Sequence, residues 1–307
     1  MANKHLDVAK KNKLIFVWVM LSLPLLRFLI FTVYINLSQL TLAFMTENEN
    51  GQIVFGLFKN IDTLLINLKY RTEWKHAIWN SIGYVPINIF IALPLSIIVV
   101  FFISKRIWGS RFFTMIFYLP NIISVVVLVL VFKNIFDRDN GVLTNILMNN
   151  FNIPFAEIPD LIYDEKYAMT TLYVYSIWAG IGGNIVLLFG AVSRIPESVK
   201  EASLLDGCGP FTELMKIYIP LIWPTISTLL MFSVAVCFQM FMHTQVMTNG
   251  VGKTHTIAFI IVEKLNGNGA IDYYYVSLLA MIVSLISIPT VRLSKIAFDK
   301  MFEPVEF

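Results

Sequence analysis

The chain has 307 residues, of which 57% are hydrophobic and only 14% are charged, and its formal net charge at pH 7 is +3. Soluble domains carry about 25% charged residues, so this composition excludes a disordered chain, a secreted disulfide scaffold and an ordinary cytosolic enzyme. The small net charge argues against nucleic-acid binding, and Cys208 and Cys237 have no metal or redox spacing. The expected solvent is therefore a lipid bilayer.

Six long stretches of the sequence are almost free of charged residues. A helix needs roughly 20 apolar residues to cross a bilayer, and these runs are too long and continuous for barrel strands. In chain order they cover residues 14–45 (interrupted by Arg27), 77–104, 112–132, 167–193, 217–252 and 273–291. The fifth run exceeds one span and must include a loop. The prediction is an all-α integral membrane protein with six transmembrane helices.

The first run has the basic start and apolar core of a signal peptide, but no small-residue cleavage pattern follows it. We therefore expect a retained first span. With both termini in the cytoplasm, more lysines and arginines fall inside than outside. The turn with Lys105, Arg106 and Arg111 is the clearest inside marker. The predicted location is the cytoplasmic membrane of the cell, as a multi-pass protein.

The inside loop at residues 194–220 is unusually long for a helix connection, and its prolines and glycine predict two short helices. Pro196 suits the first turn of the first helix, and Gly207 suits a left-handed stop for it. Pro210 starts the second helix, and Pro220 breaks it or begins the next span.

The first of these short helices is amphipathic by its spacing. Its apolar face is expected to hold Ile195, Val199 and Ala202, whereas Glu197, Lys200 and Glu201 project elsewhere. The prediction is a short rigid element held below the membrane by spans four and five.

This loop resembles the EAA loop of ABC-importer inner-membrane permeases. The family pattern has Glu-Ala-Ala, a glycine four residues past the last alanine, and an Ile-x-Leu-Pro ending. Here it reads Glu201-Ala202-Ser203, then Gly207, then Ile217-Tyr218-Ile219-Pro220. Serine replaces the third motif residue and isoleucine replaces the leucine, but the spacing is kept.

Three further segments resemble the carbohydrate-uptake branch of these permeases, the maltose- and glycerol-phosphate-type proteins. They are Tyr118-Leu119-Pro120-Asn121-Ile122-Ile123-Ser124 at the start of span three, Trp74…Ala77-Ile78-Trp79-Asn80-Ser81 before span two, and Ile195-Pro196-Glu197-Ser198 before the EAA residues. The resemblance covers about residues 74–300 and, loosely, the first span.

The resemblance implies a transport subunit that is not itself an enzyme. Its EAA helix would be a coupling helix that docks on a cytoplasmic ATPase, through Glu201, Ala202, Ser203, Asp206 and Gly207. The implied partners are a second permease subunit in a heterodimer, two ATPase subunits, an extracytoplasmic solute-binding protein and the bilayer, with no nucleic acid. This chain would bind no cofactor, because ATP and Mg²⁺ sit on the ATPase.

The expected organisation then has four parts. Residues 1–45 form an N-terminal cytoplasmic tail and the first span, and residues 46–76 form an extracytoplasmic segment whose end is expected to anchor at the membrane interface. Residues 77–300 form the permease core, with its EAA loop at 194–220, and residues 301–307 form a C-terminal tail.

Polar and aromatic residues inside spans four and five are the candidates for the substrate pathway. Polar groups are costly in lipid and tend to face a cavity or another helix, and amides with aromatic rings suit sugar hydroxyls and CH faces. The candidates are Asn184, Gln239, Trp178, Phe238, Phe241 and Met242. Gln239 and His243 are expected to share a face of span five, and Gly180, Gly182 and Gly183 to be close-packing sites.

Two other function classes predict patterns of their own. An ion-coupled secondary transporter of a small polar solute predicts intramembrane acids or a repeat, and a membrane enzyme predicts a catalytic constellation in the spans; neither pattern is visible. Gly252-Lys253-Thr254 resembles the end of a phosphate-binding loop, but position 247, where the first glycine belongs, is Met247. ATP is therefore expected on another chain.

Overall fold

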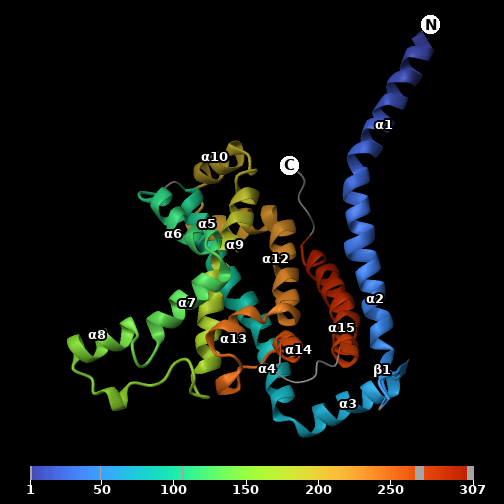
Figure 1. Cartoon of the computed structure of the whole chain (residues 1–307). Helices are drawn as coiled ribbons and strands as arrows, with labels where there is room; N and C mark the ends of the chain where they lie inside the picture. The colour runs from blue at the N-terminus through green and yellow to red at the C-terminus, as the bar shows by residue number, and fades with distance from the viewer. Residues whose placement is uncertain (1, 49, 106, 267–272, 303–307) are drawn as a thin grey trace. The chain divides into compact units, whose positions relative to one another are not determined.

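The computed structural model describes residues 2–48, 50–105, 107–266 and 273–302, and of residues 2–10 and 204 it describes the backbone alone. Helices make up most of the chain (Figure 1). The chain divides into two compact units, one with Met1–Ile66 and Gly267–Ile282 and the other with Asn67–Asn266 and Val283–Phe307. The predicted coupling loop and substrate-pathway residues all belong to the second unit.

The first unit begins with a long apolar helix. α1 (Ala2–Phe28), a π-helical segment (Leu29–Tyr34) and α2 (Ile35–Ala43) are continuous, and Lys11–Ala43 is long and apolar enough to span a membrane. An antiparallel hairpin of β1 (Met45–Glu47) and β2 (Ile53–Phe55) follows. The hairpin is a local exception to the all-α prediction, with which the mainly helical chain agrees. Its turn forms because the side-chain oxygen of Asn48 accepts hydrogen bonds from the backbone N–H groups of Asn50 and Gln52.

The second unit contains further long apolar helices, reached through α3 (Leu57–Tyr70). α4 (Thr72–Ile87), a π-helical segment (Asn88–Ala92) and α5 (Leu93–Ser104) form one span, and α9 (Ala168–Val192) forms another. α11 (Pro210–Glu213), a π-helical segment (Leu214–Tyr218) and α12 (Ile219–Gln239) form a third. α15 (Tyr273–Asp299) is also long enough to span, and it begins in the first unit and ends in the second. Five of the six predicted spans are confirmed in length and composition.

The remaining predicted span, residues 112–132, is not one straight helix. α6 (Ser110–Ile122) and α7 (Val125–Phe136) meet at an angle of 107°. Ile123 and Ser124 between them have extended backbone. Pro120 lies in the last turn of α6, where it removes a helical N–H donor and crowds the preceding turn. The pair is therefore a broken span or a re-entrant loop.

The segments between the spans carry short helices. α8 (Val142–Phe151) agrees with the helical piece that the sequence suggests there, and a 3₁₀ turn (Phe155–Glu157) follows it. After α12 come α13 (Met242–Met247), a 3₁₀ turn (Val251–Lys253) and α14 (Ile257–Asn266). α12 ends at Gln239, which confirms that the fifth apolar run includes a loop.

Two clusters of buried apolar side chains form the core of the second unit. One lies between α5, α9 and α12, and the other lies between α7, α9 and α13. α6 also crosses α9 closely, because a Cβ at Gly182 would lie only 2.4 Å from the backbone oxygen of Phe117. Gly182 is therefore a close-packing site, as predicted. At Gly180 a Cβ would meet no atom of the described residues within 4 Å, so this chain alone provides no close contact there.

Candidate functional site

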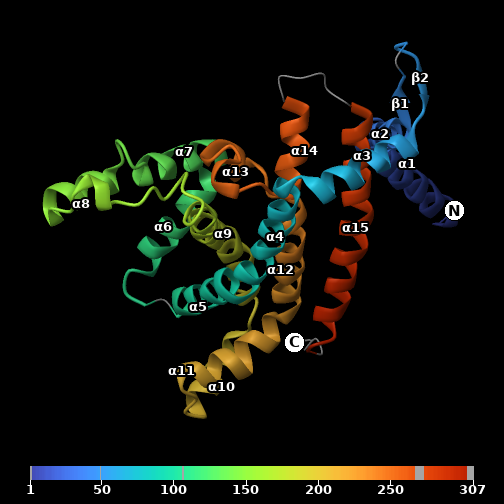
Figure 2. The ribbon, with the colours of Figure 1, turned by 90° about the horizontal axis from the view of Figure 1, so that it is seen from below.

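A short helix, α10 (Glu197–Leu205), lies between α9 and α11, where the sequence predicts the coupling helix. It lies beyond the ends of α5, α9 and α12 in both views (Figures 1 and 2). Its end is fixed as the sequence predicts, because Gly207 adopts a left-handed backbone with φ of +70°. The N–H of Cys208 donates to the carbonyl of Ser203 at 3.0 Å, which closes the helix end. Pro210 begins α11 as expected.

On the inward face of α10, one residue differs from the prediction: Ser203 takes the place of Ala202. Ile195 is buried and Val199 packs against the core of α5, α9 and α12, but Ala202 is exposed and Ser203 is buried instead. A spacing of four residues from Ile195 reaches Val199 and Ser203, so the helix meets the core at a slightly different rotation. Ser203 also donates a hydrogen bond to the carbonyl of Lys200 at 2.7 Å.

The outward face of α10 carries the acidic residues. Glu201 and Asp206 are exposed, as are Ala202 and Gly207. Glu197 pairs with Lys200 at 3.0 Å, whereas Glu201 makes no ion pair within the part of the chain that the structure describes. Four of the five predicted coupling residues are therefore available to a partner, and Ser203 faces the body of the subunit.

A buried ion pair holds the next segment of the loop in place. Glu213 at the end of α11 is 3% exposed, and its two carboxylate oxygens accept from Nζ of Lys105 at 2.5 and 2.6 Å. The same ammonium group lies 5.4 Å from the ring centre of Phe101 and 5.9 Å from that of Tyr218. Lys105, which follows α5, thereby ties that span to the segment that carries α10.

The predicted substrate-pathway residues divide into separate places. Trp178 on α9 belongs to an aromatic cluster, and Phe238 and Gln239 at the end of α12 line a groove. Phe241 and Met242 are half-buried at the start of α13. Asn184 is half-buried on α9, and its amide makes no hydrogen bond to any residue that the structure describes. In the part of the chain that the structure describes, these residues therefore have separate surroundings.

The aromatic cluster lies between α7, α9 and α13. Phe132 contacts Tyr175 edge to face, with ring centres 5.1 Å apart, and lies tilted against Trp178 at 6.0 Å. Trp178 is 43% exposed, so one large ring of the cluster is open at the surface of this chain. Sequence reasoning missed Phe132 and Tyr175. The signal that was available is helical spacing, Phe132 with Phe136 on α7 and Tyr175 with Trp178 on α9.

His243 and Gln239 do not share a helical face, so this prediction is wrong. α12 ends at Gln239, and Met240 has an extended backbone with φ −76° and ψ 105°. The hydroxyl of Thr256 donates to the carbonyl of Met240, which holds the chain in this break. His243 lies instead in α13, where its ring packs edge to face on Tyr175 at 4.9 Å.

Burial lowers the pKa of His243 to about 4, and its Nδ1 is buried with no hydrogen-bond partner in the described ranges. A histidine in an unfolded chain has a pKa near 6.5. Between pH 4 and pH 6.5 the unfolded chain therefore binds more protons at His243 than the folded chain does. The contribution of neutral His243 to stability is therefore complete above pH 6.5 and is lost as the pH falls towards 4.

We expect the wild-type chain to lose about 1–3 kcal/mol more than a His243→Phe variant when the pH is lowered from 7.5 to 5. Phenylalanine keeps the ring against Tyr175 and removes the titrating group. The measurement is the apparent free energy of unfolding in detergent at each pH. Equal losses in the two proteins would contradict the assignment of this acid sensitivity to His243.

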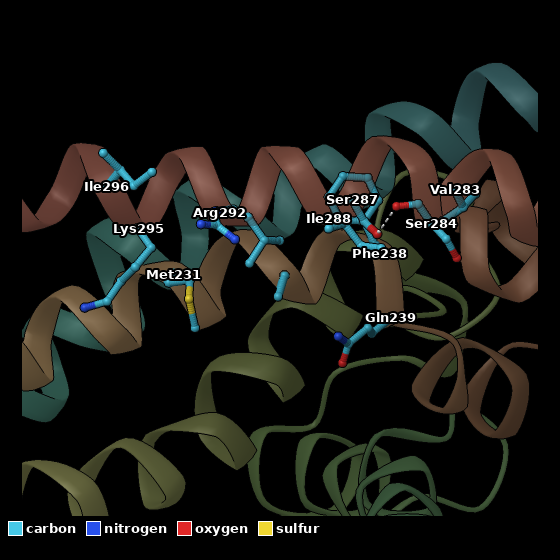
Figure 3. A pocket seen from close by; sticks show the side chains of 12 residues that line it. Met231, Phe238, Gln239, Val283, Ser284, Ser287, Ile288, Arg292, Lys295 and Ile296 are labelled. Atoms are coloured by element: carbon cyan, nitrogen blue, oxygen red, sulfur yellow. Dashed lines mark hydrogen bonds between the residues drawn. The ribbon is translucent and has the colours of Figure 1, made fainter. Parts of the chain in front are cut away.

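The groove beside Gln239 lies between α12 and α15 and has a volume of about 760 Å³ (Figure 3). Phe238 and Met231 of α12 face Ile288 and Val291 of α15 across it, so its walls are largely apolar. Arg292 and Lys295 lie toward one end of the groove and Gln239 toward the other (Figure 3). Gln239 is the one amide among the residues that line this groove. The described residues therefore do not form a sugar pathway with several amides here.

Comparison with known proteins finds sugar transporters. The chain is 24% identical over 244 residues to the maltose/maltodextrin transport system permease protein MalF of Escherichia coli (strain K12), covering 72% of this chain and 45% of that protein. It is 26% identical over 212 residues to MalF of Klebsiella aerogenes, covering 62% of this chain and 39% of that protein. The chain thus spans less than half the length of these relatives.

Solved structures share the fold. A chain of a bacterial ABC transporter involved in the import of the acidic polysaccharide alginate matches with a TM-score of 0.78 at 17% identity, covering 97% of this chain and 99% of that one. Residues 92–302 match the family described as binding-protein-dependent transport system inner membrane component. This match includes α9, α10 and α12, and hence the whole EAA loop. The chain is therefore a multi-pass membrane protein that belongs to the binding-protein-dependent transport system inner membrane component family.

Proposed function

We propose that this chain is a permease subunit of an ATP-binding-cassette importer and forms half of the translocation pathway for a carbohydrate, an oligosaccharide or a related polyol. The observation that carries the proposal is α10, a short helix with exposed Glu201 between two membrane-spanning helices of a binding-protein-dependent transport component. An isolated helix of this length is marginal in water, but α10 follows the buried Ile195 and packs Val199 against the core of α5, α9 and α12.

The proposed partners follow from this role. A cytoplasmic ATPase subunit grips the exposed face of α10, and a second permease subunit completes the pathway in a heterodimer. A second ATPase subunit and an extracytoplasmic solute-binding protein complete the transporter, and ATP with Mg²⁺ binds the ATPase subunits. In this arrangement residues 194–220 and both chain termini lie in the cytoplasm, and the protein resides in the cytoplasmic membrane.

The proposed mechanism is mechanical rather than chemical. Closure of the ATPase subunits moves α10, and the Lys105–Glu213 pair and the buried residues Ile195 and Ser203 pass that movement to α5, α9 and α12. The carbohydrate crosses between the two permeases, where the exposed ring of Trp178 offers a flat apolar surface to the CH face of a sugar. Asn184 supplies an amide once the second permease is present, whereas Gln239 lines the separate groove between α12 and α15.

The test is ATP-dependent uptake of radiolabelled oligosaccharides by proteoliposomes that hold the assembled transporter. Glu201→Lys should reduce uptake by at least about tenfold, because it places a positive charge where a basic group of the ATPase is expected. Glu197→Lys reverses a charge one turn earlier on the same helix and should retain most of the uptake. Normal uptake by the Glu201 variant would overturn the coupling role, and uptake that persists without the ATPase would favour an ion-coupled transporter.

A further inference from the structure

The groove between α12 and α15 has the shape and polarity of a site for an amphiphile. Its lining extends along α15 from Val283 to Ile296, which at 1.5 Å per residue is about 20 Å. One leaflet of a bilayer has about 15 Å of hydrocarbon. Ile288 and Ile296 in the lining are 67% and 44% exposed, so the groove is open along its length on the surface of the second unit.

The groove carries positive charge at one end. Arg292 and Lys295 both line it, and no acidic residue does. Lys295 is already engaged, because its Nζ lies 2.7 Å from Oδ1 of Asp299 and 2.9 Å from Oγ of Ser227. Arg292 forms no ion pair within the described ranges of the chain, so its guanidinium charge is uncompensated. In a membrane-spanning helix such a charge is costly unless it meets water, an anion or a lipid headgroup.

The charged end is also the fixed end of the groove. The indole Nε1 of Trp223 on α12 donates to the carbonyl of Phe298 on α15 at 3.0 Å, and Ser227 is hydrogen-bonded to Asp299. These bonds hold the two helices together just beyond Arg292. The apolar part, between Met231 and Ile288, therefore extends away from a fixed cationic end.

We propose that this groove binds an anionic phospholipid, with its phosphate on Arg292 and one acyl chain along α12 and α15. A guanidinium group matches phosphate oxygens in two parallel hydrogen bonds, and the apolar walls are suited to a chain rather than to a hydrated sugar. Both helices are long and apolar enough to span the membrane, so lipid is the molecule that surrounds the groove.

The test is lipid retention by the full chain, purified in a neutral detergent and measured by native mass spectrometry. Wild-type protein should retain dioleoylphosphatidylglycerol in preference to dioleoylphosphatidylcholine. Arg292→Gln should weaken the retention of phosphatidylglycerol by about fivefold. Arg111→Gln, which removes an exposed arginine at the start of α6 outside the groove, should leave retention unchanged.

A steric pair of variants tests the chain-binding part of the groove. Ile288→Trp fills the groove and should reduce retention of phosphatidylglycerol, whereas Leu285→Trp should not. Leu285 is 64% exposed, close to the 67% of Ile288, but does not line the groove. Equal retention of the two lipids, or an equal effect of the two tryptophans, would overturn the proposal. Competition by soluble glycerol 3-phosphate at equal strength would also overturn it and assign the site to a soluble anion. If the isolated chain retained phosphatidylglycerol but the assembled transporter did not, the proposal would be overturned, and the groove would be assigned to contact with a partner subunit.

Discussion

Replacing Lys105 by methionine is expected to lower the free energy of unfolding by about 3–5 kcal/mol, because it leaves a buried carboxylate without its partner. Glu213 is 3% exposed, and both of its oxygens are bonded to the Lys105 ammonium group. Glu213→Gln should cost less, because the Lys105 side chain is 28% exposed and its head can reach water after the pair is lost. The measurement is the apparent free energy of unfolding in detergent for each variant.

The double variant separates the pair from the packing around it. Lys105→Met with Glu213→Gln removes both charges and should recover part of the loss, which gives a positive coupling energy in a double-mutant cycle. The matched control is Lys200→Met. It breaks the exposed Lys200–Glu197 pair, whose acid is 75% exposed, and should cost about 0.5 kcal/mol or less. Equal losses from the two Lys→Met changes would show that the buried pair contributes nothing special.

Local signals in the sequence predicted the helix end at Gly207 and the helix start at Pro210 correctly. Pro210 and Gly207 act on their own backbone, so a helix start and a left-handed stop could be assigned without knowledge of the surrounding fold. The rotation of α10 could not, because Ala202 and Ser203 are both small and either fits an inward position. Only packing against the core of α5, α9 and α12 selects Ser203.

The failures concern features that depend on distant parts of the chain. The bend at Ile123 and Ser124 lies inside an unbroken apolar run, and hydropathy does not distinguish a straight span from a broken one. The Lys105–Glu213 pair joins residues 108 positions apart, and nothing in the residues next to either one identifies the other. The end of α12 at Gln239 is similar, because the hydroxyl that bonds the Met240 carbonyl comes from Thr256.

Two glycines follow α10, at positions 207 and 209. Replacing each of them by proline, in separate variants, tests the coupling role. Gly207 has φ of +70°, which proline cannot adopt, whereas Gly209 has φ −67° and ψ 156°, which proline adopts readily. A Cβ at either position would meet no atom within 4 Å, so crowding does not distinguish the two sites. Gly207→Pro must therefore remodel the end of α10, and Gly209→Pro leaves it intact.

Because α10 is proposed to transmit ATPase closure, Gly207→Pro is expected to reduce ATP-dependent uptake by the reconstituted transporter at least about fivefold. Gly209→Pro should retain uptake close to wild type. Gel filtration of both variants and their insertion into the membrane should be normal, because the altered turn is exposed and lies outside the packed core. Full uptake by the Gly207 variant would mean that the shape of this helix end does not matter for coupling. Equal loss in both variants would mean that the turn tolerates no proline, and the backbone angle of Gly207 would then carry no separate role.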